Sequence, residues 1–127
     1  MMGLDAAAPR LPIVLLVDPV VASRYWMWRT LSRAFGVLEA ASAGAAREWI
    51  AQRPDIDAIV VQRMLPDAPG AELVMELERA QHPVARRAIV VERGDLRSAI
   101  AKLVGWFITR DKGLARAVLR EVERMSA

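Results

Sequence analysis

The chain has 127 residues, 54% of them hydrophobic, which fits one globular domain with a buried core and excludes a wholly disordered chain. It contains no cysteine, which excludes disulfides and thiolate metal sites and fits a cytoplasmic protein; no apolar run approaches the roughly 18 residues that cross a bilayer. The net charge of +3 comes mainly from arginines spread along the chain, so we expect neither nucleic-acid nor membrane binding.

Strands and helices are predicted to alternate along the chain after a flexible arm at residues 1–11, within one domain at residues 12–127. Continuous apolar, β-branched runs predict strands at 13–17, 37–41, 56–61, 88–91 and 106–109. Apolar residues at helical spacing predict helices at 20–35, 45–52, 71–81, 96–104 and 114–125, with Ser42 capping the second. This order predicts an α/β fold with a single doubly wound, five-stranded parallel sheet.

Binding sites in such sheets lie outside the carboxyl ends of the strands, near the point where the strand order reverses. The side chains expected there are Asp18, Pro19, Gln62, Arg63, Glu92, Arg93 and residues 109–112. The loop after the first strand has no glycine and no phosphate-binding motif occurs, which argues against a nucleotide or flavin site. Asp18 is a weak candidate for a magnesium ligand, and we expect no metal and no cofactor.

Residues 54–73, PDIDAIVVQRMLPDAPGAEL, resemble the third strand and following loop of response-regulator receiver domains, the chemotaxis-regulator-like family. That family usually has an apolar strand, an Asp, two residues, Leu-Pro and then a Gly; Leu65, Pro66 and Gly70 match. The segments IVLLVDP, VLEAASAGAAREWI and 108–110 resemble further strands of the family, so the resemblance covers about residues 12–125. It implies the flavodoxin-like receiver architecture and a role in two-component signal transduction, the phosphorelay systems of this family.

The same resemblance implies a degenerate phosphorylation pocket. The phosphoacceptor Asp falls on Gln62, whose amide cannot form an acyl phosphate. The family's paired acids fall on Asp18 and Pro19, its switch Ser/Thr on Glu92, and its Lys on Arg110. We hypothesise that Glu92 and Arg110 form an ion pair across the former pocket.

Two surfaces are candidates for a protein partner, and either could form a homodimer. Receivers usually signal through the fourth helix, fifth strand and fifth helix, which implies Ile100, Leu103, Trp106 and Phe107 here. The sequence alone adds Tyr25, Trp26 and Trp28, which one helix face cannot bury together at 100° per residue. Trp26 and Trp28 are therefore candidate anchors, unless they lie flat over the helix and cover the core.

These features favour a non-enzymatic, phosphorylation-independent pseudo-receiver that binds another protein. Two alternatives remain open. The degenerate pocket could bind a small regulatory ligand or carry an unusual modification, or the chain could be an enzyme on a flavodoxin-like fold. Affinity for Mg²⁺ separates the first two, and turnover of a substrate would support the enzyme.

Overall fold

The computed structural model describes residues 10–92, 95–107, 116–120 and 123–124. Its strands are β1 (Ile13–Val17), β2 (Gly36–Ala40), β3 (Ala58–Gln62) and β4 (Ala88–Val91), which form a 4-stranded parallel sheet in the order β2-β1-β3-β4. Its labelled helices are α2 (Val21–Leu31), α3 (Ala43–Gln52), α4 (Gly70–Arg79), the short 3₁₀ helix η1 (Pro83–Arg87) and α5 (Leu96–Phe107), and residues 116–120 and 123–124 are also helical. The predicted α/β class with a parallel sheet is confirmed.

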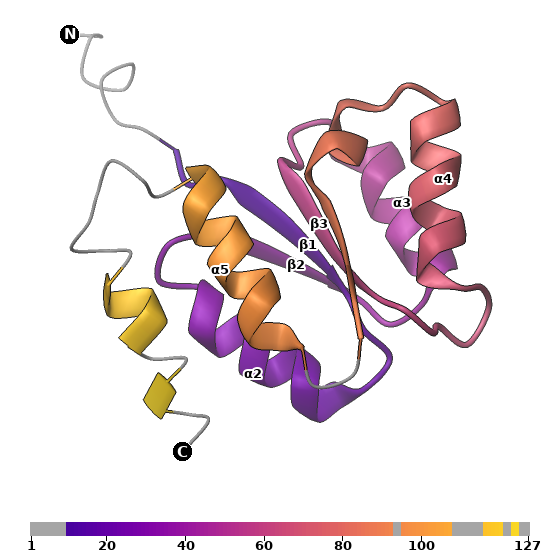
Figure 1. Cartoon of the computed structure of the whole chain (residues 1–127). Coiled ribbons are helices and arrows are strands. Elements are labelled where there is room, and N and C mark those ends of the chain that lie inside the picture. Colours follow the sequence, from indigo (N-terminus) through magenta and orange to yellow (C-terminus); the bar gives the residue numbers. More distant parts are fainter. Residues whose placement is uncertain (1–9, 93–94, 108–115, 121–122, 125–127) are drawn as a thin grey trace, which may run out of the picture.

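Helices cover both faces of the sheet, as parallel strands require. Alternate residues of the central strand β1 point to opposite faces: Val14 and Leu16 join the core with α2 and α5, whereas Leu15 and Val17 join the core with α3 and α4. Figure 1 shows this division, with α2 and α5 on one side of the strands and α3 and α4 on the other. Every residue of β1 except Ile13 is buried, because the two cores lie against its two faces.

Most predicted boundaries agree with the structure to within a few residues. The strands 13–17 and 88–91 are confirmed, and Ser42 caps α3 by accepting a hydrogen bond from the Ala45 backbone N–H at 3.1 Å. β3 begins two residues later than predicted, just after Asp57, whose carboxylate accepts from the Ile13 N–H at 2.8 Å. The predicted N-terminal arm falls mostly on residues 1–9, which lie outside the described residues.

The predicted fifth strand at 106–109 is wrong at Trp106 and Phe107, which form the last turn of α5; residues 108 and 109 lie outside the described part. The buried residues of α5 are Ala99, Ile100, Leu103 and Val104, a three-to-four-residue spacing that continues to the half-buried Phe107. A short apolar run does not by itself distinguish a buried strand from a buried helix. Here the helical period extends through Gly105 and decides the conformation.

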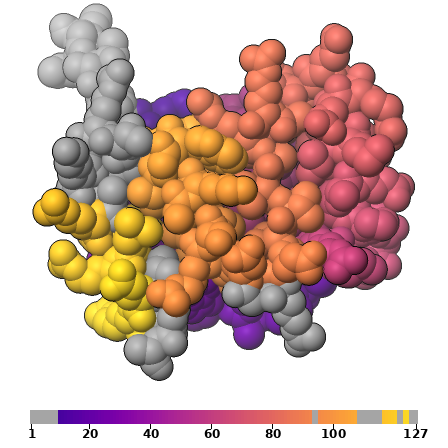
Figure 2. All heavy atoms as spheres, in the orientation of Figure 1, coloured from indigo at the N-terminus to yellow at the C-terminus, as the bar shows by residue number. Residues whose placement is uncertain are grey.

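The position of α5 also differs from the predicted crossover. Connections that step in the same direction across a parallel sheet keep their helices on one face when they are right-handed. A fifth strand beside β4 would therefore need a crossover helix on the face of the sheet that α3 and α4 cover. Instead, α5 packs on the other face beside α2, where the rings of Phe107 and Phe35 meet edge-to-face with their centres 5.9 Å apart. In Figure 2, α5 lies at the front of the molecule, next to the described residues of the C-terminal segment. Val118 of that segment belongs to the core that α2 and α5 form with the sheet.

No helix in the described part of the chain is long and apolar enough to cross a membrane.

Gly70 begins α4 at the closest approach of that helix to β3. A Cβ added there would lie 2.2 Å from the Gln62 carbonyl oxygen and 3.0 Å from the Val61 Cγ2. The Gly70 N–H donates to the Arg63 carbonyl at 2.8 Å, which holds the helix start against the strand end. The glycine is therefore needed for space, because backbone atoms cannot move aside cheaply.

We expect Gly70→Ala to lower the free energy of unfolding by about 1–3 kcal/mol, because α4 must shift away from β3. Gly105→Ala is the matched control: a Cβ there meets nothing within 4 Å, and alanine favours a helix interior by about 0.5–1 kcal/mol. Urea unfolding of both variants checks the pair. Equal effects of the two substitutions would show that the contact with Gln62 is not what requires glycine.

Asp67, in the loop between β3 and α4, ties that loop to the start of α3. Its carboxylate accepts from the backbone N–H groups of Ala43 and Gly44, each at 2.9 Å. These two hydrogen bonds, Ala43 first, hold the pKa of Asp67 below its ordinary value. An ionised carboxylate at a helix N-terminus is also favoured by the helix dipole.

A lowered pKa in the folded state means that Asp67 contributes stability above its unfolded pKa, and that this is lost as pH falls through the folded pKa. We therefore expect Asp67→Asn to make stability depend less steeply on pH between neutrality and about pH 3. Chemical denaturation across this range measures the slope. Glu48→Gln, which removes a carboxylate from the exposed face of α3, is the control. An unchanged slope in Asp67→Asn would contradict the capping role.

Candidate functional site

The strand order reverses between β1 and β3, and Asp18 and Gln62 stand at the carboxyl ends of these two strands. An open cleft of about 420 Å³ lies over this point. Among the described residues it is lined by Asp18, Pro19, Val20, Ser23, Gln62, Arg63, Met64, Glu92 and Leu96. The structure thus brings together four of the five residues predicted for the degenerate pocket; the fifth, Arg110, lies outside the described residues.

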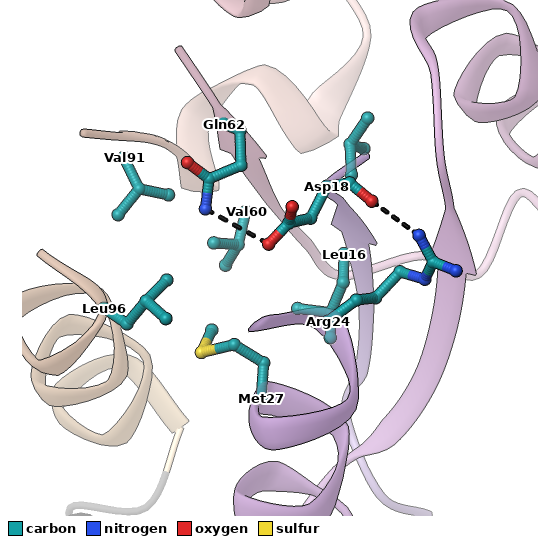
Figure 3. Close-up of a pocket in the computed structure, with 9 residues that line it drawn as sticks. Leu16, Asp18, Arg24, Met27, Val60, Gln62, Val91 and Leu96 are labelled. Atoms are coloured by element: carbon teal, nitrogen blue, oxygen red, sulfur yellow. Dashed lines mark hydrogen bonds between the residues drawn. The ribbon is translucent and has the colours of Figure 1, made fainter. Parts of the chain in front are cut away.

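Asp18 is only 5% exposed, and its carboxylate is supplied with donors from within the protein. One oxygen accepts from the Val20 backbone N–H at 2.8 Å. The other accepts from the Ser23 hydroxyl and from the Gln62 side-chain amide, the latter at 3.2 Å. The Gln62 amide points directly at this carboxylate (Figure 3). A buried carboxylate needs such donors, because an unsatisfied buried charge is strongly unfavourable.

Arg24 contacts the backbone of Asp18 and not its carboxylate. Its Nη1 donates to the Asp18 backbone carbonyl at 2.7 Å, as Figure 3 shows, and its Nε donates to the Glu39 carboxylate at 3.1 Å. This arginine therefore bridges β1, α2 and β2.

Ser23 was missed by sequence reasoning although it donates to Asp18. The available signal was its place in the first turn of α2, five residues after Asp18, which directly follows β1. A polar side chain at that position can reach back to the strand end. Ser23 is the residue that, with Val20, joins the carboxylate to the start of α2.

Beneath Asp18 and Gln62 the site is narrow and mostly apolar. The space there is about 10 Å³, no more than about one water molecule occupies. Its lining includes Leu16, Val60, Val91, Met27 and Leu96, which surround the polar pair in Figure 3. A ligand would therefore contact the outer cleft and not the interior of the sheet.

Glu92 lies at the rim of the cleft and faces Arg63, with 3.5 Å between the carboxylate and the guanidinium. Both side chains are largely exposed, so this pair contributes little stability. The hypothesised partner Arg110 lies outside the described residues, and the Glu92–Arg110 pair stays a prediction.

The chemistry that this geometry allows is limited. Among the described residues, no group of three or more His, Asp or Glu side chains is placed to hold a metal ion. Asp18 is the carboxylate that Gln62 contacts, and its oxygens already accept three hydrogen bonds. The Gln62 amide is not a nucleophile of the kind that forms a phosphoryl-enzyme.

Of the residues predicted to contact a partner, two are excluded by burial. Ile100 and Leu103 are 0% exposed and belong to the core with α2, so their prediction as partner contacts is wrong. The expectation placed them on a surface helix, but α5 turns this face toward the sheet. Trp106 remains partly exposed, while Phe107 is half-buried beneath the Arg87 guanidinium, 4.8 Å from its ring centre.

The aromatic residues of α2 separate as predicted. Trp26 is half-buried and packs against the core, whereas Tyr25 and Trp28 are exposed and stack on each other with ring centres 6.1 Å apart. The expectation that one helix face cannot bury all three is confirmed.

We expect Gln62→Glu to lower the free energy of unfolding by about 1–3 kcal/mol at neutral pH, because a second carboxylate replaces the amide donor 3.2 Å from Asp18. The loss should shrink in acid, where one proton shared by the two carboxyls restores a hydrogen bond. Urea denaturation of the variant and the wild type, at neutral pH and in acid, measures the loss of stability under each condition. Gln52→Glu, an exposed change on α3, is the control, and equal effects of the two changes would contradict the buried contact.

No protein-family model and no curated protein sequence matches the chain. Solved structures do. The signal receiver domain of an HD domain-containing protein from Pseudomonas fluorescens Pf-5 superimposes with a TM-score of 0.61 at 23% identity, covering 91% of this chain and 97% of that one. A response regulator receiver protein from Pseudomonas putida gives 0.58 at 24% identity, covering 73% and 78%.

A third similar structure is the MaeR response regulator bound to beryllium trifluoride, with a TM-score of 0.60 at 12% identity, covering 91% of this chain and 99% of that one. At these identities the likeness establishes the fold. The parallel sheet, its strand order and these neighbours together show that the chain has the fold of response-regulator receiver domains.

Proposed function

We propose that this protein is a pseudo-receiver of two-component signal transduction that acts by binding another protein, without being phosphorylated. One observation carries the proposal: the residue at the end of β3, beside Asp18, is Gln62. Receivers are switched by an acyl phosphate on an aspartate at the position that Gln62 fills by the resemblance. An amide there removes the nucleophile while leaving the fold intact.

The hydrogen bonds around Asp18 support the same proposal. A receiver that binds Mg²⁺ must offer carboxylate oxygens to the ion. Here the Asp18 oxygens are engaged by Val20, Ser23 and Gln62, and Pro19 occupies the next position. The protein itself thus supplies hydrogen-bond partners to this carboxylate, and no buried side-chain polar atom in the described residues lacks a partner.

The proposal includes three further statements about the protein. It is not an enzyme, it needs no cofactor or Mg²⁺, and it works in the cytoplasm with a protein partner. The first two rest on the chemistry of the cleft, where the described side chains offer neither a metal cluster nor an activated nucleophile. The third rests on the resemblance to receivers and on the exposed aromatic side chains of α2.

A second candidate function is favoured by the cleft itself. With about 420 Å³ of open space, polar groups at its base and Val20, Met64 and Leu96 at its sides, it could hold a small regulatory ligand. In that case the cleft would sense the ligand and the partner-binding surface would respond.

Titration with Mg²⁺, and then with Mg²⁺ plus beryllofluoride, separates the two functions. We expect no saturable change in the amide NMR signals of Asp18, Gln62 and Glu92 in the wild-type protein, because no aspartate stands where beryllofluoride would attach. The double variant Pro19→Asp/Gln62→Asp restores carboxylates beside Asp18 and serves as the positive control, with a response to Mg²⁺ expected. A saturable response of the wild type would overturn the phosphorylation-independent proposal and support ligand sensing.

A further inference from the structure

An apolar stripe runs along the outer face of α2. Val21 is 68% exposed, Tyr25 57% and Trp28 40%. These three residues, here called the α2 stripe, are spaced i, i+4 and i+7, so they lie in a row on one side of the helix. The opposite side of the same helix already supplies Met27, Thr30 and Leu31 to the interior. The α2 stripe is therefore not needed by the fold.

The α2 stripe is ordered and continues beyond the helix. Tyr25 and Trp28 stack with ring planes 27° apart, so the two exposed rings form one continuous apolar surface. At the start of α2 the exposed Val20 extends the apolar surface to the rim of the cleft, which it lines together with the exposed Met64. Large exposed aromatic and apolar groups in a row are characteristic of surfaces that bind another molecule.

The charges around the α2 stripe are positive. No acidic residue occurs within α2, and at 100° per residue the order around its outer side is Arg24, Trp28, Val21, Tyr25, Arg29. An arginine thus borders the apolar row on each side. Arg24 is partly neutralised by Glu39, while Arg29 is exposed at the last turn.

We propose that the α2 stripe docks an amphipathic helix of a partner protein, whose apolar side chains are spaced like the stripe and flanked by Asp or Glu. This deepens the proposed function, on which it rests, by naming the class of partner. The apolar row from Val21 to Trp28 spans about two helical turns, roughly 10 Å, which suits ridge-to-groove contact with one helix. Acidic flanks would meet Arg24 and Arg29, and such complementarity selects partners by charge.

A second copy of the chain fits this surface less well. A two-fold interface through the α2 stripe would place arginines that border one stripe near those bordering the other, and like charges across an interface are unfavourable. A lipid surface also fits less well, because two arginines border the row, whereas segments drawn to anionic membranes carry clusters of about four to eight basic residues.

The test uses the full chain and three fluorescein-labelled synthetic peptides of about four helical turns. The first carries Leu at positions i, i+3, i+4 and i+7 with Glu on both flanks, the second replaces these Glu by Lys, and the third scrambles the first. Fluorescence anisotropy should show binding of the Glu peptide, at least about tenfold weaker binding of the Lys peptide, and none of the scrambled one. Tyr25→Ala and Trp28→Ala should each lower the affinity for the Glu peptide by about tenfold or more.

Matched variants make the outcome specific. Met75→Ala removes an exposed apolar side chain from α4 and should leave binding unchanged, whereas Arg29→Glu should reduce the preference for Glu over Lys peptides. Circular dichroism of each variant confirms that it is folded. Equal binding of the Glu and Lys peptides, no binding of either, or equal loss in Met75→Ala and Trp28→Ala would overturn the proposal.

Two further measurements identify other occupants. Light scattering that finds a dimer in the wild type and a monomer in Trp28→Ala would overturn the proposal in favour of self-association. Binding to phosphatidylserine vesicles that Trp28→Ala abolishes, without binding of the Glu peptide, would overturn it in favour of a lipid surface. Because the Mg²⁺ and beryllofluoride titration reports on Asp18 and Gln62 alone, failure of the α2 stripe and failure of phosphorylation independence are separate results.

Discussion

The buried carboxylate of Asp18 is the constraint that organises the carboxyl edge of the sheet. It ends the central strand β1 at 5% exposure, where a negative charge is tolerated only if donors surround it. The donors come from three places: the backbone at Val20, the first turn of α2 at Ser23, and the end of β3 at Gln62. The same carboxylate therefore fixes the entry of α2 and joins β1 to β3 at the point where the strand order reverses.

Much of the fold could be predicted from the sequence because its central strands have only one plausible structure. Residues 13–17 form an uninterrupted apolar run, and a strand covered on both faces is the simplest way to bury it. The error came at Trp106 and Phe107, where a short apolar run is compatible with either conformation. The helical period of the buried residues before them favours a helix, and Phe107 also packs on Phe35, a contact between residues far apart in the sequence that the pattern does not specify.

The position of the candidate site could be predicted from the sequence, but its side-chain contacts could be predicted only in part. Asp18, Gln62 and Glu92 were identifiable because the carboxyl ends of parallel strands meet at one edge. The hydrogen bond between Asp18 and Gln62, the role of Ser23 and the pairing of Glu92 with Arg63 depend on side-chain directions that periodicity does not specify. In the same way, the sequence indicated that the aromatic residues of α2 cannot all be buried, but only the packing of Trp26 shows which two are exposed.

The network at Asp18 and the exposed face of α2 are mechanically connected, and this gives the proposed function its physical logic. Val20 and Ser23 bind the carboxylate at one end of the helix, while Thr30 and Leu31 are buried at the other. A helix held at both ends presents the α2 stripe in one arrangement, and a preorganised surface loses less conformational entropy when a partner docks. A receiver that signals by phosphorylation must instead keep two arrangements close in free energy. In the proposed function, the neutral amide of Gln62 stands in place of a phosphorylated aspartate, and constitutive binding follows from a single arrangement of α2.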